Sequence, residues 1–411
     1  MNLGQITTIL VVSLLCYSCS GQAKDNTIEK ELEISTFESK KKLPIVVGAA
    51  RTKEYLKLLK GKKVGVVANH TSMINETHLV DSLIGLGVNI VRVFSPEHGF
   101  RGKSDAGERV VSAIDKATGL PIISLYGKNK KPYPDQINDL DLLIFDIQDV
   151  GVRFYTYIST MSYVMEACAE NNKELIVLDR PNPIGNIVDG PILEEKHQSF
   201  VGLHAVPIAH GMTVGEYAQM VNGQGWLAEQ VNCKLTVIKA ENYDHTSPYK
   251  LPIKPSPNLP NMQSIYLYPS LCLFEGTPIS IGRGTTTPFQ VLGHPLIVSD
   301  QYAFTPKSMN GAKSPKLEGE ECKGYNLSQL DAGFNAGKRG IDLSWLIKIY
   351  TNFPKKEGFF TQMFLLLSGT DQLQKQLETG IPEDEIYASW QEGLTEFKAI
   401  RKQYLLYKDF E

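Results

Sequence analysis

Glu97, His98 and Arg101 bring three chemically active side chains together within five positions of the sequence. They lie in the segment 94–102, which reads FSPEHGFRG and follows a predicted strand over residues 88–94. A glutamate delivers a proton or acts as a nucleophile, a histidine adds a second titrating group, and an arginine offers a fixed positive fork to an anion. Loops at the carboxyl ends of parallel strands are where α/β proteins place such groups. This segment is therefore predicted to form part of a functional site.

The elements that must position these residues follow an alternating pattern from residue 62 onward. Predicted strands cover residues 63–69, 88–94, 120–125, 141–147, 175–178 and 234–238. Predicted helices cover 76–87, 156–171 and 213–222, and the last begins at a capping box of Thr213 and Glu216. This alternation predicts a parallel sheet with helices on both faces. Five prolines within 248–260 predict a rigid connection, and a helical apolar stripe over 386–397 predicts a packed helix near the end of the chain.

Polar residues gather at the ends of several predicted strands, and a parallel sheet would bring them to one edge, over a single crevice. In chain order they are Asn69, His70, Glu97, His98, Arg101, Asp146, Gln148, Asp149, Arg153, Tyr155, Asp179 and Arg180. Aromatic rings beside carboxylates and arginines suit a sugar, because a ring stacks on the sugar's C–H face while polar groups hold its hydroxyls. Two alternatives remain open: Asp146 forms only a structural ion pair with Arg153 or Arg180, and the tyrosines only pack at the sheet edge.

Composition excludes several classes of function. The 411 residues suffice for two domains, and the net charge of −3 gives no general attraction to nucleic acid. The segment 282–285, Gly-Arg-Gly-Thr, could present backbone N–H groups and a guanidinium to an anion, but it lacks the spacing of a nucleotide-binding loop. No Gly-x-Ser-x-Gly elbow of an α/β-hydrolase follows a predicted strand. The cysteines after residue 20 match no metal framework, so neither a metal nor another cofactor is predicted. They are interpreted as buried free thiols, with disulfides left open: Cys168, Cys233, Cys272 and Cys322.

The N-terminus has the pattern of an export signal. An apolar run from Ile6 to Cys16 is as long as the core of a signal peptide and is followed by the sequence YSCSG. This arrangement resembles a loose bacterial lipobox, which predicts a lipoprotein-type signal over 1–19, lipidation of Cys19 and a polar tether over 20–43. The protein is then expected to be exported to the periplasm or cell surface and held at a bacterial membrane by lipid. The alternative is an ordinary cleaved signal.

Eight motifs together resemble the exo-β-N-acetylmuramidase family over roughly residues 43–411. They are SPEHG (95–99), DIQDVGVRFY (146–155), DRPNP (179–183), NLPN (258–261), FEGT (274–277), GRGT (282–285), ASWQ (388–391) and YLLY (404–407). The resemblance implies an α/β fold, with a Rossmann-like catalytic domain over 44–245 and a smaller α+β domain over 246–411 that closes an active cleft. It implies release of N-acetylmuramic acid from the non-reducing ends of peptidoglycan fragments in cell-wall turnover, without metal or nucleotide. It also adds Asn258, Asn261, Glu275 and Arg283 to the expected substrate-binding residues.

This resemblance suggests a mechanism with several versions left open. Glu97 is expected to protonate the glycosidic oxygen, while Asp146 or Asp149 activates water, attacks the anomeric carbon, or orients a substrate acetamido group that attacks it. His98 is expected to tune Glu97 or to hold the acetamido group. The lactyl carboxylate of muramic acid needs a cation, for which Arg101, Arg153 and Arg283 are candidates.

Two other functions compete with a glycosidase. The first alternative is a non-catalytic peptidoglycan-binding lipoprotein, which would use the same crevice but need no pair of carboxylates. A phosphate- or nucleotide-handling enzyme is disfavoured by the missing glycine-rich fingerprint and by the export signal. The expected partners are muropeptides or disaccharides derived from peptidoglycan.

Overall fold

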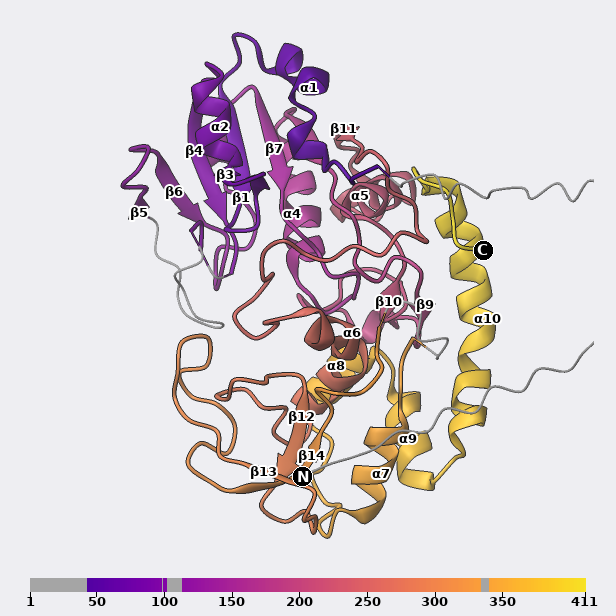
Figure 1. Ribbon diagram of the computed structural model, residues 1–411. Helices are drawn as coiled ribbons and strands as arrows, with labels where there is room; N and C mark the ends of the chain where they lie inside the picture. The colour runs from indigo at the N-terminus through magenta and orange to yellow at the C-terminus, as the bar shows by residue number, and fades with distance from the viewer. Residues whose placement is uncertain (1–42, 98, 102–112, 334–339) are drawn as a thin grey trace, which may run out of the picture. The chain divides into compact units, whose positions relative to one another are not determined.

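The computed structural model describes residues 43–97, 99–101, 113–333 and 340–411. A seven-stranded sheet forms the core of the larger part of the fold, which is the upper part in Figure 1. The strand order is β11-β8-β7-β1-β4-β6-β5, and all neighbours are parallel except β5 (Ala113–Ile114), which is antiparallel to β6. The parallel strands are β1 (Val64–Ala68), β4 (Ile90–Ser95), β6 (Pro121–Ser124), β7 (Leu142–Asp146), β8 (Glu174–Leu178) and β11 (Lys234–Ile238). The predicted parallel sheet is thus confirmed, with each predicted strand present.

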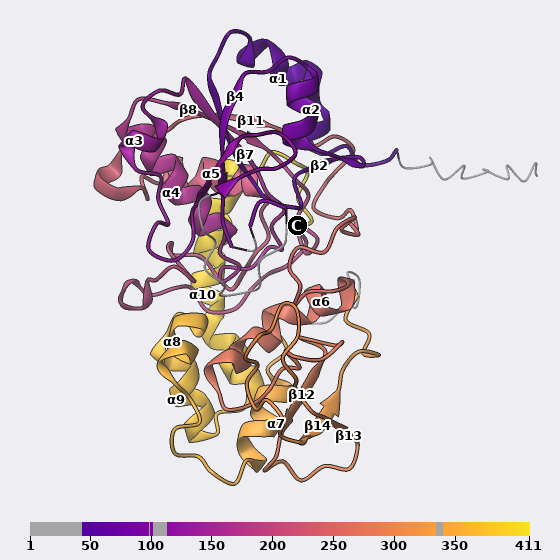
Figure 2. The ribbon, with the colours of Figure 1, turned by 90° about the vertical axis from the view of Figure 1, so that its left-hand side faces the viewer.

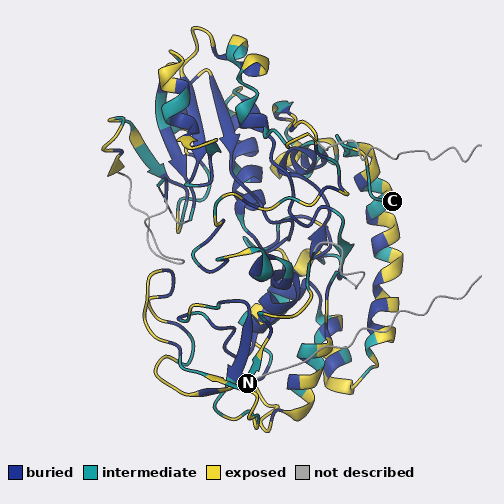
Figure 3. Cartoon of the chain, in the orientation of Figure 1, coloured by how far each residue is buried: buried dark blue, intermediate teal, exposed yellow. Residues whose placement is uncertain are grey.

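Helices cover the sheet, and the side chains of its strands alternate between two hydrophobic cores. In β1, Val64, Val66 and Ala68 pack in the core that contains α1 and α2, whereas Val67 belongs to the core that contains α4 and α5. The central strands are therefore buried on both faces, as expected for a parallel sheet (Figure 3). The helices of this part are α1 (Thr52–Leu59), α2 (Leu79–Gly85), α3 (Pro134–Ile137), α4 (Tyr157–Glu170) and α5 (Val214–Gly223).

Two of the three predicted helices match closely and one is shorter than expected. The predicted capping box is present: the Thr213 hydroxyl accepts a hydrogen bond from the Glu216 N–H, and the Glu216 carboxylate accepts one from the Thr213 N–H. The helix predicted over 76–87 begins only at Leu79, because a hairpin of β2 (Met73–Ile74) and β3 (Thr77–His78) occupies the preceding positions.

The order of the strands creates a topological switch point between β1 and β7. The chain starts in the middle of the sheet at β1, adds β4 and β6 on one side, and then returns to add β7, β8 and β11 on the other. In sheets of this doubly wound type, ligands bind outside the carboxyl ends of the strands at the switch point. The polar residues that follow β1 and β7 lie there.

The smaller C-terminal part combines helices with an antiparallel sheet of order β12-β14-β13 (Figure 2). Its strands are β12 (Val291–His294), β13 (Tyr302–Phe304) and β14 (Cys322–Asn326), and its helices are α6 (Met262–Leu271), α7 (Ser344–Asn352), α8 (Gln362–Ser368), α9 (Asp371–Thr379) and α10 (Glu383–Arg401). The apolar stripe of α10 is buried as predicted, at Ile386, Trp390, Leu394 and Phe397. This confirms an α/β sheet region with a smaller α+β region.

The end of the chain returns to the large sheet. The Tyr407 hydroxyl donates to Asp179 at 2.6 Å, and the Leu406 N–H donates to Glu216 at 2.8 Å. Because of such contacts, residues 43–411 form one compact unit. The boundary predicted between residues 245 and 246 stays a prediction.

The predicted signal, tether and lipidated Cys19 lie outside the described residues. Within the ranges that the structure describes, no helix is both long and apolar enough to cross a membrane.

Candidate active site

A hydrogen-bond network joins the segments that follow β1 and β7. Ala68 pairs with Asp146 in the sheet register, so the next residues of both strands meet. The Asn69 side-chain oxygen accepts from the Thr71 hydroxyl at 2.6 Å, and that hydroxyl accepts from the Gln148 N–H at 3.0 Å. The side-chain amide of Gln148 donates to two main-chain carbonyls, each at 2.8 Å. One is the carbonyl of Asp149, and the other is that of Pro181, which follows β8. Asn69, Gln148 and Asp149 are therefore held together at the switch point.

Asp146 is engaged by Arg180. Its two oxygens accept from Arg180 Nε at 2.6 Å and Nη2 at 2.9 Å, and the side chains are 0% and 3% exposed. Arg180 also donates to the carbonyl of Met73. Of the alternatives open in the sequence, the geometry favours the structural ion pair, with Arg180 and not Arg153 as the partner of Asp146.

Asp149 has a different environment from Asp146. One carboxylate oxygen accepts from the Gly151 N–H at 2.7 Å, while the other has no hydrogen-bond partner among the described residues. Burial raises the pKa of Asp149 to about 7, although the bond from Gly151 opposes this rise. His210 lies 3.8 Å away, but burial lowers its pKa to about 3, so it stays neutral and does not compensate the carboxylate. Asp149 can therefore change its protonation state near neutral pH.

Tyr157 lies near both Asp149 and Glu97. Its hydroxyl is buried and makes no hydrogen bond within the described part of the chain, although Tyr155 and Asn69 lie near it. Burial raises the pKa of Tyr157, and the charges of Glu97 and Asp149 raise it further. Both carboxyl groups therefore act on one hydroxyl. Glu97 is partly exposed at the end of the β4 loop, and its neighbour His98 lies outside the described residues.

The proline-rich connection lies against this edge of the sheet. The Tyr155 hydroxyl donates to the carbonyl of Pro255 at 2.7 Å, and His70 Nε2 donates to the carbonyl of Lys254 at 2.8 Å. These contacts bring the beginning of the C-terminal part to the ends of β1 and β7.

A series of aromatic contacts continues from the sheet edge into the C-terminal part. The ring centroids of Tyr155 and Tyr157 are 4.9 Å apart, those of Tyr155 and Tyr268 6.1 Å, and those of Tyr268 and Phe289 4.8 Å. The Arg283 guanidinium lies 5.0 Å from the Phe289 centroid, and its Nε is 2.5 Å from Glu275. This aromatic series connects Glu275 and Arg283 with the neighbourhood of Asp149 and Glu97.

Two family models account for most of this chain. The N-terminal model of the exo-β-N-acetylmuramidase NamZ matches residues 64–263, and the C-terminal model matches residues 266–407. The chain belongs to the exo-β-N-acetylmuramidase NamZ family. The resemblance seen in the sequence is thus confirmed, and with it the prediction of a glycosidase.

Similar proteins support the same assignment to the NamZ family. The chain is 40% identical over 376 residues to the peptidoglycan β-N-acetylmuramidase NamZ of Bacillus subtilis. The alignment covers 86% of this chain and 89% of the relative. Two crystal structures of DUF1343 family proteins from Bacteroides fragilis have the same fold. One has a TM-score of 0.84 and 50% identity, covering 89% of this chain and 100% of that chain. The other has a TM-score of 0.76 and 32% identity, covering 89% and 99%.

Several residues expected to bind substrate in this NamZ family member have structural partners instead. Arg153 is 1% exposed and donates to four main-chain carbonyls, of Pro191, Val206, Leu367 and Ser368. Arg101 lies between the carboxylates of Asp81 and Asp115. Asp179 accepts from the Thr213 hydroxyl and the Gly215 N–H at the start of α5, and from the Tyr407 hydroxyl near the end of the chain. Asn258 donates to the carbonyl of Gly311, and Asn261 caps α6 and donates to Gln290. The geometry favours structural roles for these five residues.

Tyr157 and His210 are absent from the predicted site residues, although the structure places both beside Asp149. The signal for Tyr157 was the spacing of two aromatic residues, at positions 155 and 157, directly after a polar strand end. His210 is the second residue of a two-residue strand, β10 (Ala209–His210), for which the sequence carries no pattern.

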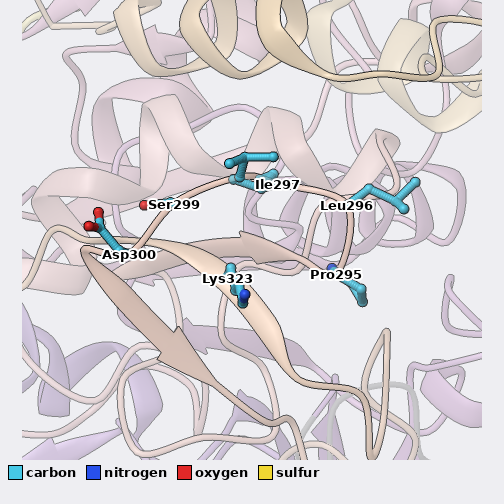
Figure 4. A pocket seen from close by; sticks show the side chains of 7 residues that line it. Pro295, Leu296, Ile297, Ser299, Asp300 and Lys323 are labelled. Carbon is cyan, nitrogen blue, oxygen red and sulfur yellow. The ribbon is translucent and has the colours of Figure 1, made fainter.

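A separate pocket of about 520 Å³ lies in the C-terminal part (Figure 4). Its lining residues are Pro295, Leu296, Ile297, Val298, Ser299, Asp300 and Lys323, none of which was predicted for the site. Across the described ranges, no group of three or more His, Cys, Asp or Glu side chains is placed to hold a metal ion. The four cysteines predicted as buried free thiols are buried and free.

Proposed function

We propose that this chain is an exo-acting glycosidase that releases N-acetylmuramic acid from the non-reducing ends of peptidoglycan fragments in cell-wall turnover. The observation that carries the proposal is the match of both family models, in order, across the sheet part and the C-terminal part. The Bacillus subtilis relative, named a peptidoglycan β-N-acetylmuramidase, supports the same substrate class.

In this proposal Glu97 is the general acid. Hydrolysis of a glycoside requires a proton for the leaving oxygen and a second group on the other side of the anomeric carbon. Glu97 is partly exposed, and its charge acts on the buried Tyr157, which also lies near Asp149. A side chain that is partly exposed can contact both solvent and substrate.

Asp149, and not Asp146, is proposed as the second group. Both oxygens of Asp146 are paired with Arg180, so its use would require breaking a buried ion pair. Asp149 keeps one oxygen unpaired, and burial raises its pKa to about 7. That oxygen is buried, so a substrate acetamido N–H or a water molecule must displace neighbouring side chains to reach it, and it would then accept the hydrogen bond that the second group's task requires.

The test of this proposal uses a chromogenic β-glycoside of N-acetylmuramic acid and the purified protein. The wild type is expected to release the chromophore, and Glu97→Gln is expected to lose about 10²- to 10⁴-fold in kcat, the usual contribution of a positioned acid. Arg92→Gln is a control on the far part of β4, where Arg92 pairs with Asp139. Binding of the glycoside without any release by the wild type would favour the non-catalytic peptidoglycan-binding alternative.

We also propose that the protein is exported and lipid-anchored at Cys19. The support is the apolar run from Ile6 to Cys16 and the small residue Ser18 before Cys19. Metabolic labelling with a radioactive fatty acid is expected to label the wild type and not Cys19→Ala. Equal labelling of both proteins would exclude Cys19 as the lipidated residue.

A further inference from the structure

We infer that Arg283 recognises the lactyl carboxylate of N-acetylmuramic acid and so determines the preference for muramic acid over glucosamine. This inference rests on the proposed function, because it concerns the sugar that the same site accepts. N-acetylmuramic acid differs from N-acetylglucosamine only by the lactyl ether on its ring. A residue that reads this difference must offer a cation with unoccupied donors.

The contacts of the arginines near the site separate Arg283 from the others. Both terminal nitrogens of Arg153 donate hydrogen bonds to main-chain carbonyls, four in all, and the side chain is inaccessible. Arg180 is buried against Asp146. Arg101 already contacts two carboxylates, of Asp81 and Asp115, so a third carboxylate would be repelled.

The Arg283 guanidinium is fixed through Nε, while its two terminal nitrogens remain available to a ligand. Its Nε donates to Glu275, whereas within the described ranges no protein group contacts either terminal nitrogen at hydrogen-bond distance. The side chain is 31% exposed, and its guanidinium lies over the ring of Phe289. A planar fork that is already oriented can bind a carboxylate through two parallel hydrogen bonds with little further loss of entropy.

The backbone conformation of the loop that carries Arg283 requires glycine on both sides of the arginine. Gly282 and Gly284 both have a φ of 81°, which side-chain-bearing residues rarely adopt. A Cβ on Gly282 would lie 2.5 Å from Val291, and one on Gly284 would lie 2.6 Å from Pro315. Phe289, beneath the guanidinium, has a φ of 56° although it is bulky and buried. Strained backbone of this kind clusters at active sites and ligand sites.

The aromatic series places Arg283 toward the proposed catalytic carboxylates. Phe289, under the Arg283 guanidinium, contacts Tyr268 with ring centroids 4.8 Å apart, and Tyr268 contacts Tyr155 at 6.1 Å. Arg283 is therefore connected through Phe289 and Tyr268 to Tyr155, six positions after Asp149 in the sequence. A cation at one end and carboxyl groups at the other suit a sugar whose acidic substituent and reacting carbon lie on different ring atoms.

The test measures binding of free N-acetylmuramic acid and free N-acetylglucosamine to the full chain by titration calorimetry. Wild type is expected to bind the acid sugar more tightly. Arg283→Gln is expected to lose about 10- to 100-fold in affinity for N-acetylmuramic acid, the range for a hydrogen-bonded charge pair, and to keep its affinity for N-acetylglucosamine. Arg283→Lys keeps the charge without the fork and is expected to lose less.

Arg92→Gln, which removes another partly buried, ion-paired arginine, is expected to change neither affinity. Equal losses for both sugars in Arg283→Gln, an unchanged affinity for the acid sugar, or a wild type without preference would each overturn the inference. If Arg283→Gln does not fold, Arg283→Lys decides, and unchanged preference for the acid sugar in a folded Arg283→Lys with no loss of affinity would contradict the fork geometry. Binding needs no turnover, so failure of the glycosidase proposal would appear separately, as binding without hydrolysis.

Discussion

Asp146 and Arg180 form a two-pronged ion pair, with oxygen–nitrogen distances of 2.6 and 2.9 Å, beneath the carboxyl edge of the sheet where neither side chain is accessible. A buried pair of this kind stabilises a protein little compared with an apolar pair, but removal of one partner leaves an uncompensated charge. Asp146→Asn is therefore expected to lower the free energy of unfolding by about 3–5 kcal/mol.

The double variant Asp146→Leu with Arg180→Met tests this explanation, because it leaves no charge behind. It is expected to lose less stability in urea denaturation than the sum of the two single variants. Additive losses would show that the two side chains act independently.

Asp149 predicts a pH dependence of stability with a defined sign. Its pKa is raised from 3.8 to about 7 in the folded protein, so the unfolded chain releases this proton first as pH rises. Below pH 4 the carboxyl is protonated in both states and does not lower the free energy of unfolding. As the pH rises from 4 to 7, ionisation in the unfolded chain lowers the free energy of unfolding progressively. Asp149→Asn removes the group, so its stability relative to wild type is expected to increase across this interval, by a few kcal/mol at most. Denaturant titrations at several pH values measure the difference, and a constant difference would contradict the raised pKa.

Tyr157 and Tyr155 form a matched pair for mutation to Phe. The Tyr155 hydroxyl donates to the carbonyl of Pro255, so Tyr155→Phe is expected to lose about 1 kcal/mol of stability. The Tyr157 hydroxyl has no such partner among the described residues, so Tyr157→Phe is expected to be neutral or slightly stabilising. Because this hydroxyl lies near Glu97 and Asp149, the same variant is expected to lose about 5- to 10-fold in kcat/KM. A destabilised Tyr157→Phe with normal kinetics would assign Tyr157 a structural role only.

The C-terminal tail is expected to stabilise the sheet through Tyr407. Its hydroxyl donates to Asp179 and accepts from the Ala240 N–H, and both bonds are lost in Tyr407→Phe. We expect this variant to lose about 1–3 kcal/mol, because a buried carboxylate loses a donor. Tyr404→Phe is the control, since among the described residues the Tyr404 hydroxyl accepts a single hydrogen bond, from the more exposed Gln224. Thermal unfolding that ranks the two variants in the opposite order would contradict this role.

The sheet could be predicted because its signals are local. The alternation of strand and helix patterns and the capping box of Thr213 and Glu216 depend on neighbours within a few positions, and the structure has both. Gathering of polar residues at strand ends also followed from the parallel sheet alone.

The roles of individual residues depended on partners distant in sequence. Arg153 was expected to meet a substrate carboxylate, but its partners include Leu367 and Ser368, more than 200 positions away. Asp179 has the position of a site residue in the sequence, but its carboxylate accepts a hydrogen bond from Tyr407, 228 positions away. The sequence indicates Tyr157 only as an aromatic ring near the strand end, because a buried hydroxyl without a hydrogen-bond partner is a property of packing. Sequence patterns identify which residues are polar at an edge, whereas only the fold decides which of them remain unpaired.

The most direct test of the central claim is product analysis on a muramic-acid-terminated glycan tetrasaccharide, using mass spectrometry over a time course. An exo-acting muramidase is expected to release free N-acetylmuramic acid as the first product and to leave a trisaccharide that begins with N-acetylglucosamine. Glu97→Gln is expected to release neither at a comparable rate. Appearance of disaccharides as first products, or normal release by Glu97→Gln, would contradict the account.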